Sequence, residues 1–549
     1  MVDMALIVGG TVIYAAVMIY LGYLGWKSTK SGEDFLLAGR NVPPWIIGLS
    51  YGSTFISTAA IIGFGGWCAT WGMGIIWLAA LNILVGLLFA FIFFGKKVRK
   101  LGHKLKASTF PELLGKSYNS SFIRWFMAVV ILIGMPLYAA AVLIGGSTFM
   151  STTIDGLSVD WALIIFAAIT AAYVITGGLK AVMYTDALQG ALMIAGMLII
   201  LAVTLTLVGG VEHANQQLTD NANLMITQTP AKYVQPGMQG WTSFPTFGSD
   251  NWIVLVGTII LPVGIGVLAQ PQLAVRFMTA KNGKALNRAV PWGGVFLLMT
   301  VGFAYMIGAW SNDYFLNTQG KIAINAASVN TTINNIIPVF INASMNQFVV
   351  TLFLLTLLAA AMSTLSSIFH TMGSAAGYDI WSELKKRKVL PERMRGEETG
   401  KSSLFKNRLA TSIFILVSLA VAWFLYHNPA GAGGVIAIAT TMFFGICASA
   451  YLPLYVHALW SKKPSKLAAE ASLAVGTIAW LIWMLFCCTT DGKVMGVCKA
   501  IFGVDSLVSK PWSILDPIVI ALPLATITLI VVWAFDKKSR MEAKLAETA

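Results

Sequence analysis

Long apolar segments recur along the whole chain and are separated by short polar connections. Many of them approach or exceed about 20 residues, the length that an α-helix needs to cross the hydrocarbon layer of a membrane. The first segment is too long for a signal peptide and has no basic region before it, so we retain it as a span. The pattern predicts an all-α polytopic membrane protein with about thirteen transmembrane helices, at residues 4–26, 44–69, 75–95, 122–149, 159–177, 181–209, 252–275, 290–310, 348–376, 409–427, 431–460, 467–488 and 514–535.

Hydroxyl side chains interrupt the apolar pattern in the middle of the ninth predicted span. Residues 359–367 read AAAMSTLSS, and helical geometry places Ser363, Ser366 and Ser367 on one face with Thr364 at its edge. A ring of oxygen atoms suits a hard cation such as sodium. Small hydroxylated residues also mediate helix packing in membranes and can bond to their own backbone carbonyls. The run alone leaves both interpretations open.

Two other predicted spans contain helix-breaking residues. The second has the polar run SYGST at residues 50–54 and a glycine-rich exit, and the seventh has two prolines and two glutamines within residues 262–272. A simple kink would account for either break. The two spans are five apart, however, so each would open a five-helix unit, and an odd number of spans inverts the second unit. Breaks at corresponding positions of inverted units indicate a binding site near the middle of the membrane.

Composition and charge support the same class of protein. Hydrophobic residues make up 57% of the chain and charged residues 11%, which excludes an ordinary soluble domain. With the N-terminus outside and the C-terminus cytoplasmic, nearly all Lys and Arg residues fall in cytoplasmic loops, as expected for a protein of the cell membrane. The five left for the outside are Lys232, Lys321, Lys493, Lys499 and Lys510. Because the basic residues are spread over short loops, a nucleic-acid partner is not expected.

The sequence shows no arrangement typical of a membrane enzyme. There is no His-Glu-His cluster, no nucleophile with a base and no pair of carboxylates within the spans, so we do not expect catalysis. Cys488 and Cys498 would both lie at the outer face and could pair, which the sequence does not decide. The largest cytoplasmic loop, at 380–408, is basic and is predicted to be a solvated linker. No obligate protein partner is evident.

Four stretches are similar to one family of membrane proteins. They are FLLAGRNVPPW at 35–45, ITGGLKAVMYTDALQG at 175–190, QPQLAVRFMTAK at 270–281 and AAAMSTLSS at 359–367. Through them the chain resembles the sodium/solute symporter family, which includes sodium-coupled glucose, proline, pantothenate, monocarboxylate and sialic acid carriers.

The resemblance implies a leucine-transporter-type fold with a 5+5 inverted repeat. We expect an extra N-terminal helix at 1–30, a first repeat at 40–210 and a second repeat at 250–460. Two further helices and a short cytoplasmic tail would fill 465–549.

The resemblance also implies where sodium would bind. The family's shared site would use the backbone carbonyls of Ser53, Ile56 and Ala360. It would add the hydroxyls of Ser363 and Thr364. A possible second sodium would lie between Asp186 and the hydroxyls of Ser363, Ser366 and Ser367. Alternatively, Asp186 is a carboxylate near the cytoplasmic interface that pairs with Lys180 or Arg276. We therefore expect one co-transported sodium ion, or two if Asp186 also binds one.

By the same resemblance, the second span has apolar residues where sugar carriers present polar side chains to their substrate. These residues are Phe55, Ala59 and Ala60. This apolar wall favours a small, partly apolar solute, whose carboxylate could be held by the N-terminus of a half-helix. The residues expected to contact it are Thr54, Phe55, Thr58, Ala59 and Gln270. Arg276 is expected to contact lipid headgroups or form an ion pair at a gate, and His370 to be a helix histidine with a satisfied hydrogen bond.

The sequence therefore predicts a sodium-coupled secondary active symporter that works by alternating access within the lipid bilayer. Its substrate would be a small carboxylate-bearing molecule, such as a monocarboxylate, pantothenate or an amino acid like proline. The alternatives are a sodium/sugar-type symporter and a transporter-like solute sensor.

Overall fold

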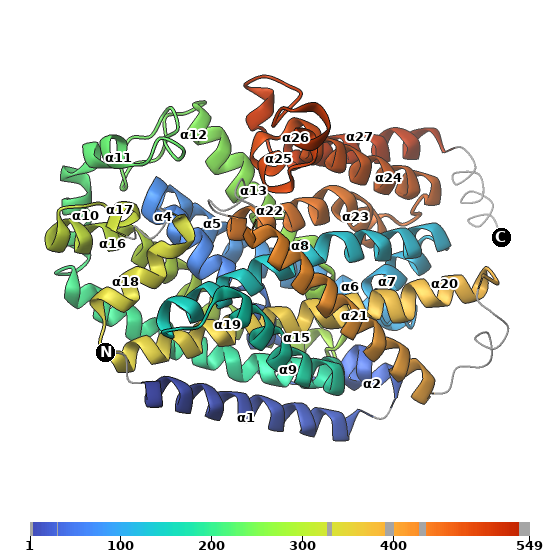
Figure 1. Ribbon diagram of the computed structural model, residues 1–549. Helices are drawn as coiled ribbons and strands as arrows, with labels where there is room; N and C mark the ends of the chain where they lie inside the picture. Colours follow the sequence, from blue (N-terminus) through green and yellow to red (C-terminus); the bar gives the residue numbers. More distant parts are fainter. Residues whose placement is uncertain (1–3, 30, 327–331, 390–399, 428–434, 537–549) are drawn as a thin grey trace.

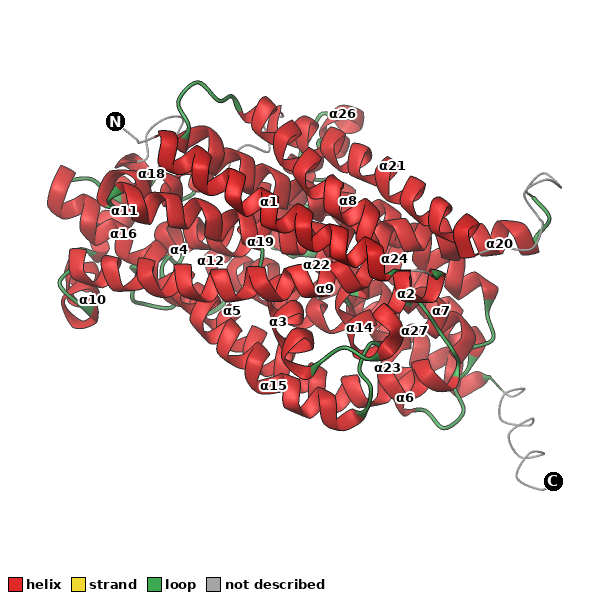
Figure 2. Ribbon diagram, turned by 90° about the horizontal axis from the view of Figure 1, so that it is seen from below, coloured by secondary structure: helices red, strands yellow, loops and turns green. Residues whose placement is uncertain are grey.

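The fold is built from α-helices. The computed structural model describes residues 4–29, 31–326, 332–389, 400–427 and 435–536, and within them Figures 1 and 2 show helices joined by loops, with a single isolated β-bridge between Val42 and Ala280. This composition follows from the solvent: lipid offers no hydrogen-bond partner, so each spanning segment must satisfy its own backbone groups as a helix.

The first part of the chain forms helices α1 to α11. Their bounds are α1 (Met4–Ser28), α2 (Gly32–Leu37), α3 (Pro44–Phe55), α4 (Gly65–Trp71), α5 (Ile76–Leu81), α6 (Lys96–Lys104), α7 (Phe110–Ser117), α8 (Ser121–Thr153), α9 (Val159–Leu207), α10 (Val211–Asp220) and α11 (Ala222–Gln228). The last two lie between the predicted spans 181–209 and 252–275.

The second part forms helices α12 to α27. Their bounds are α12 (Asp250–Ile253), α13 (Leu261–Gly266), α14 (Pro271–Met278), α15 (Gly283–Leu297), α16 (Phe303–Gln319), α17 (Ala323–Ala326), α18 (Ile336–Ser344), α19 (Gln347–Ser374), α20 (Trp381–Lys386), α21 (Gly400–His427), α22 (Val435–Ile446), α23 (Leu452–Trp460), α24 (Lys466–Ile482), α25 (Thr489–Met495), α26 (Val497–Phe502) and α27 (Pro517–Phe535).

Several of these helices continue into one another through π-helical or 3₁₀ segments, so that one span carries several labels. The segments used below are η2 (Ala59–Phe64), η5 (Val254–Ile260), η6 (Val267–Ala269) and η9 (Ala375–Ile380). The ninth predicted span, for example, begins with α19 and runs on through η9 into α20.

Eleven helical segments of the described chain are long and apolar enough to cross a membrane. They are Ala5–Ser28, Met73–Lys104, Ser121–Thr153, Gly177–Leu207, Asp250–Met278, Gly283–Gln319, Gln347–Lys386, Ser403–His427, Val435–Trp460, Lys466–Cys487 and Pro517–Phe535. The pair Pro44–Phe55 and Ala59–Trp71 would be a twelfth, bent by 52°, and Val159–Ile175 is a shorter apolar helix. The chain is therefore an integral membrane protein. Several spans are longer than predicted.

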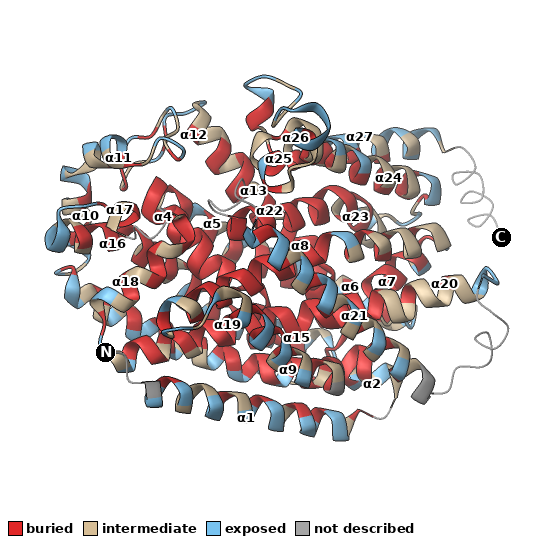
Figure 3. Ribbon diagram, viewed as in Figure 1, coloured by how far each residue is buried: buried red, intermediate tan, exposed pale blue. Residues whose placement is uncertain are grey.

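The burial of residues follows the expected pattern for a helical bundle in lipid. Figure 3 shows buried residues concentrated in the middle of the bundle, whereas α1 along one side presents exposed positions. Large apolar side chains of α1, such as Val12, Ile13 and Tyr20, are mostly exposed, as expected for a surface that contacts lipid tails. By contrast, α19 is buried along its length from Leu357 to Ser374 and forms the central helix.

Both predicted helix breaks are present. The second span is interrupted between α3 and η2, where Ile56 is extended (φ −94°, ψ 111°). The seventh is interrupted between η6 and α14, where Gln270 is extended (φ −70°, ψ 124°) just before Pro271. A residue before proline avoids the helical region, which explains the second break. The sequence prediction of two interrupted spans is confirmed.

A third break separates the fifth and sixth predicted spans within α9. Gly178 has φ 61° and ψ −170°, a conformation that only glycine adopts without strain, and the helix resumes beyond it. A Cβ atom at this position would also lie 2.7 Å from the ring of Phe35. The GGLK sequence thus turns the chain where α9 passes the short helix α2.

Three further predictions concern the basic loop at 380–408, the cytoplasmic tail and a pair of cysteines. The basic loop at 380–408 is shorter than expected, because α20 extends to Lys386 and α21 begins at Gly400; residues 390–399 lie outside the described part of the chain. The predicted cytoplasmic tail, at 537–549, also lies outside it. Cys488 and Cys498 are both buried free thiols.

Candidate functional site

The break after α3 leaves backbone carbonyls without partners in their own helix. The last carbonyls of a helix have no following turn to donate to them, so other groups must do so. Here the partners are hydroxyls of α19: Ser363 donates to the carbonyl of Ser53 at 2.8 Å, and Thr364 donates to the carbonyl of Thr54 at 3.0 Å. Two of the hydroxyls noted in the sequence therefore bridge the broken helix and the central helix.

The same two hydroxyls also contact α19 itself. Ser363 Oγ and Thr364 Oγ1 each lie 3.1 Å from the carbonyl oxygen of Ala360. Carbonyl and hydroxyl oxygens from two helices therefore converge, and all of the side chains involved are buried. Of the five residues predicted to bind the shared sodium, Ser363 contacts Ser53 and Ala360, and Thr364 contacts Ala360. The fifth, Ile56, caps α3 at the break. Such a set of uncharged hard oxygens is chemically suited to sodium.

A second polar cluster lies beside the first and centres on Asp186 of α9. One carboxylate oxygen, Oδ2, accepts hydrogen bonds from Ser50 at 2.9 Å and from Thr54 at 3.0 Å. The other, Oδ1, accepts from Ser366 at 3.2 Å. Asp186 is fully buried. An isolated buried carboxylate would be very costly, so a cation is expected close by.

That cation is the guanidinium of Arg276, on α14. Its Nη2 atom lies 2.8 Å from Asp186 Oδ2 and also donates to Thr54 at 2.5 Å and to Ser367 at 2.6 Å. Its Nε atom donates to Ser50 at 3.0 Å, and Nη1 donates to the carbonyl of Gln272. Arg276 is fully buried. The arrangement connects α3, α9, α14 and α19.

These contacts settle several expectations from the sequence. Asp186 pairs with Arg276, one of the two partners that the alternative for Asp186 named. Of the two expectations for Arg276, an ion pair is present, whereas contact with lipid headgroups is wrong, because the guanidinium is buried among polar side chains. Of the residues predicted around a second sodium, Ser366 and Ser367 do face Asp186. The hydroxyl of Ser363 instead faces the carbonyl of Ser53. The Nε2 atom of His370 donates a hydrogen bond to the carbonyl of Phe35 at 2.9 Å, as expected.

The predicted apolar wall also lies at the break. Phe55, Ala59 and Ala60 are buried, and the ring of Phe55 lies 6.1 Å from that of Phe444 on α22. Phe444 in turn contacts Tyr138 of α8, with ring centroids 5.4 Å apart. The sequence analysis did not identify Phe444 and Tyr138 as residues of the site, because nothing in their local pattern separates them from other buried aromatic side chains.

The polar residues predicted to contact solute are partly engaged with the protein. Thr54 belongs to the cluster around Asp186, and Thr58 donates to the carbonyl of Val142 at 3.0 Å. Gln270 accepts a hydrogen bond from Gln272 at 2.7 Å, while its own Nε2 and the Oε1 of Gln272 are buried without partners among the described residues. Unused buried amide groups at a helix break are well placed to bind a polar solute.

Ser50 was also missed as a site residue. It contacts both Asp186 and Arg276, and its spacing of four from Thr54 places both hydroxyls on one face of α3. That spacing was the available signal in the sequence.

Comparison with known proteins places the chain among carriers of small solutes. The model of the sodium:solute symporter family matches residues 35–476. The chain is 27% identical over 470 residues to the sodium/pantothenate symporter of Haemophilus influenzae, an alignment that covers 85% of this chain and 87% of that protein. It is 23% identical over 481 residues to the sodium/proline symporter of Escherichia coli, covering 86% and 87%.

The fold is also similar to a solved structure. A Na⁺-coupled sialic acid symporter in a substrate-bound outward-open state superimposes with a TM-score of 0.72 at 18% sequence identity, and the alignment covers 96% of each chain. At this level of identity the likeness concerns the fold.

Proposed function

The chain belongs to the sodium:solute symporter family, and we propose that it couples the entry of sodium to the import of a small carboxylate-bearing solute by alternating access. The observation that carries this proposal is the pairing of Ser363 and Thr364 with the carbonyls at the end of α3. It places hard oxygen ligands at a helix break, where coupling ions bind in transporters of this kind. The relatives' named activities, sodium-coupled uptake of pantothenate and of proline, support it.

Within this proposal, the shared sodium ion binds to the carbonyls of Ser53, Ile56 and Ala360 and the hydroxyls of Ser363 and Thr364. The two hydroxyls now donate to carbonyls, and each can rotate its proton away so that its oxygen faces the ion. Sodium then attracts carbonyls of both helices at once. The ion therefore stabilises the contact between α3 and α19, and its release loosens that contact.

The solute lies next to this ion, against Phe55, Ala59 and the polar groups of Thr54, Thr58 and Gln270. The wall is apolar, and few amides and carboxylates are present to satisfy the hydroxyls of a sugar. This favours a small solute with one carboxylate. The helix α14 begins directly after Gln270 with Pro271, which has no N–H, and the N–H groups of Leu273 and Ala274 donate to the carbonyl of Gln270. Its N-terminus therefore offers such an anion the N–H of Gln272 and the positive end of the helix dipole.

The number of sodium ions depends on Arg276. A second ion would bind at Asp186, with Ser366 and Ser367, only if the guanidinium moved away, because Arg276 already contacts Asp186 and Ser367. With the guanidinium in place, one sodium ion is transported. At a membrane potential of about 100 mV, each sodium ion supplies roughly 2.3 kcal/mol.

The finer architecture is also part of the proposal. The repeats at 40–210 and 250–460 form an inverted 5+5 unit, each opening with a broken helix. One helix precedes them at 1–30 and two follow within 465–549. Val159–Ile175 and the bent pair then complete thirteen spans. The N-terminus faces outside and the C-terminus faces the cytoplasm, as the distribution of Lys and Arg favours. Such a protein transports solute and catalyses no reaction.

Uptake by proteoliposomes tests the function directly. Purified protein is reconstituted and offered labelled pantothenate, proline, lactate and glucose, with and without an inward sodium gradient. We expect gradient-dependent accumulation of at least one carboxylate and no accumulation of glucose. Accumulation of glucose alone would support the sugar-type alternative, and binding without any flux would support the solute sensor.

A further inference from the structure

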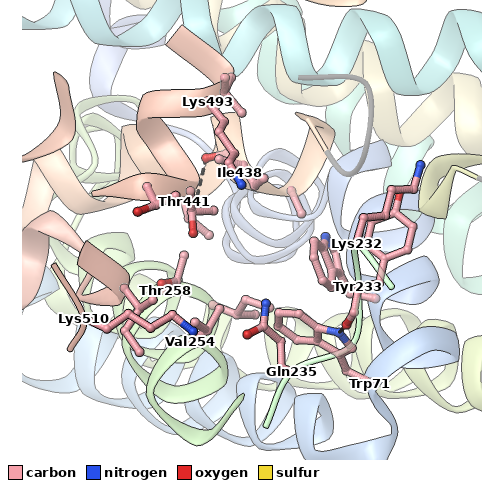
Figure 4. A pocket seen from close by; sticks show the side chains of 17 residues that line it. Trp71, Lys232, Tyr233, Gln235, Val254, Thr258, Ile438, Thr441, Lys493 and Lys510 are labelled. Atoms are coloured by element: carbon pink, nitrogen blue, oxygen red, sulfur yellow. Dashed lines mark hydrogen bonds between the residues drawn. The ribbon is translucent and has the colours of Figure 1, made fainter. Parts of the chain in front are cut away.

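A cavity of about 300 Å³ lies between the outer half of the broken second span and the segment that follows the twelfth. Its walls come from α4, η5, α22, α25 and the loop that precedes α12 (Figure 4). From this cavity the chain leads inward to both helix breaks: α4 follows η2, which begins at Ala59, and η5 leads through α13 and η6 to Gln270. Two of the segments that line the cavity therefore belong to the two interrupted spans.

Three lysines line this cavity: Lys232, Lys493 and Lys510. They are three of only five Lys or Arg residues that the charge pattern assigns to the outside, so basic charge on that side is concentrated here. In Figure 4, Lys493 extends into the cavity from the top of the view and Lys510 from the left, and Lys232 lies on the right beside Tyr233. The three lysines come from separate segments of the chain.

Acidic residues only partly cancel this charge. Asp250 forms an ion pair with Lys510, whereas no carboxylate in the described part of the chain forms an ion pair with Lys493. Asp491 and Asp516 are buried close to the cavity. Burial raises the pKa of Asp491 to about 7, and burial together with the neighbouring Asp491 raises the pKa of Asp516 well above its ordinary value. These two carboxyl groups therefore carry less negative charge near neutral pH than free aspartates would.

Two residues that line the cavity carry buried polar atoms. The indole Nε1 of Trp67 and the hydroxyl of Thr258 have no hydrogen-bond partner among the described residues. Trp67 packs against Trp71 with ring centroids 4.1 Å apart. The lining thus combines lysine ammonium groups with tryptophan and threonine side chains, residue types that donate hydrogen bonds to polar ligands.

We propose that this cavity is a vestibule that binds the carboxylate of an anionic solute before the solute reaches the central site, with Lys493 and Lys510 as the attracting charges. The inference rests on the proposed transport function and makes its substrate class more specific: a monoanion is favoured over a zwitterion or a neutral molecule. Lys493 and Lys510 lie beyond residue 476, where the match to the family model ends.

The physical effect expected of such a vestibule is electrostatic enrichment. Positive charges in a recess with low-dielectric walls raise the local concentration of an anion and its association rate, and dissolved salt screens the effect. The maximal transport rate and the sodium dependence should not change when these charges are removed, because the central site is untouched.

A reporter thiol measures the potential without any solute. In the full-length protein, Thr490→Cys introduces a thiol on the cavity wall, and its rates of reaction with an anionic and a cationic methanethiosulfonate reagent are compared. We expect the ratio of anionic to cationic rates to fall by roughly tenfold when Lys493→Gln and Lys510→Gln are added. Lys499→Gln removes a charge from α26 outside the cavity and is the matched control, expected to leave the ratio nearly unchanged.

Binding is tested with two probes that differ in one group. Pantothenate carries a carboxylate, and panthenol carries a hydroxyl in its place. Pantothenate should slow the labelling of the introduced thiol, panthenol should not, and the double lysine variant should require about tenfold more pantothenate for the same protection. An unchanged rate ratio, or equal protection by both probes, would overturn the proposal. If wild-type vesicles accumulate no solute while the two thiol results hold, the transport function fails and the anion-binding vestibule stands.

Discussion

The guanidinium of Arg276 contacts the carboxylate of Asp186 at 2.8 Å, and both side chains are fully buried in the part of the bundle where α3, α9, α14 and α19 meet. Arg276 lies on α14, the half-helix that follows the break in the seventh span, and Asp186 lies on the sixth span. The ion pair therefore joins these two segments. A guanidinium supplies several fixed donors, and here they reach Ser50, Thr54 and Ser367 as well as the carboxylate. The cation that neutralises Asp186 thus belongs to the protein itself.

Removing the guanidinium should open Asp186 to sodium. With one sodium ion and a monoanionic solute, wild-type transport moves no net charge. In Arg276→Gln, the carboxylate, Ser366 and Ser367 become available to a second ion, so the Hill coefficient for sodium should rise toward two. Net inward charge should rise to about one elementary charge per solute. The measurement is charge and solute flux in reconstituted vesicles at a clamped voltage.

Asp186→Asn provides the contrasting variant. It leaves the guanidinium buried without a counter-charge, a change that typically costs about 3–5 kcal/mol of stability, so we expect much less folded protein in the membrane. The double variant Asp186→Asn with Arg276→Gln removes both charges and should recover most of the folded protein. A wild-type Hill coefficient of two that is the same in Arg276→Gln would mean that a second sodium binds without displacing the guanidinium.

Removing the bridging hydroxyls should weaken sodium binding. Ser363→Ala and Thr364→Ala each delete one oxygen ligand with little loss of volume, and each also leaves a carbonyl at the end of α3 without its donor. We expect each to raise the sodium concentration for half-maximal uptake by roughly tenfold, equivalent to about 1.4 kcal/mol. The maximal rate at saturating sodium should fall less.

Ser374→Ala is the matched control for these two variants. Its hydroxyl lies on the same helix and donates only within α19, to the carbonyl of Thr371 at 3.0 Å. It should leave the sodium dependence unchanged. If Ser363→Ala and Thr364→Ala behaved like this control, the hydroxyls would be packing groups and the proposed sodium site would be wrong.

The sequence predicted the features that depend on local composition. The breaks at Ile56 and Gln270 could be anticipated because polar residues, glycine and proline lower helix propensity where they stand. The hydroxyl face of α19 followed from helical spacing alone. The expectation that these breaks lie beside α19 came from the family resemblance and not from periodicity.

Features that depend on which distant segments of the chain pack together were not predicted. Arg276 is one helical turn from Gln272, and nothing in that spacing reveals that α14 lies against Asp186. The vestibule lysines were recognised only as external charges, since Lys232 and Lys493 are about 260 residues apart in sequence. They line the same cavity only because the segment after the twelfth span packs against α22. The fifth predicted span differs for another reason: the apolar helix Val159–Ile175 is short, because Gly178 divides α9.

Close packing between α13 and α22 should depend on Gly266. A Cβ atom at this position would lie 2.1 Å from the carbonyl oxygen of Phe444, a backbone atom that cannot move without displacing α22. We expect Gly266→Ala to reduce the yield of folded protein and to lower its melting temperature, because overpacking typically costs about 1–3 kcal/mol. Gly257→Ala, in the same span, would meet only a methyl group of Val519 at 3.7 Å and should be tolerated. Equal melting temperatures for the two variants would contradict this account.

The amide groups at the seventh span's break should affect the solute and spare the ion. Gln270 accepts a hydrogen bond from Gln272 and retains a buried, unpaired Nε2 group, while neither residue contacts the hydroxyls of Ser363 or Thr364. In Gln270→Leu, a donor available to the solute is lost at similar side-chain volume. The concentration of solute for half-maximal uptake should then rise by roughly tenfold, the effect of losing one hydrogen bond of about 1.4 kcal/mol. The half-maximal sodium concentration, measured at saturating solute, should stay within about twofold of wild type. A loss of sodium affinity equal to the loss of solute affinity would mean that Gln270 supports the fold at the break instead of binding solute.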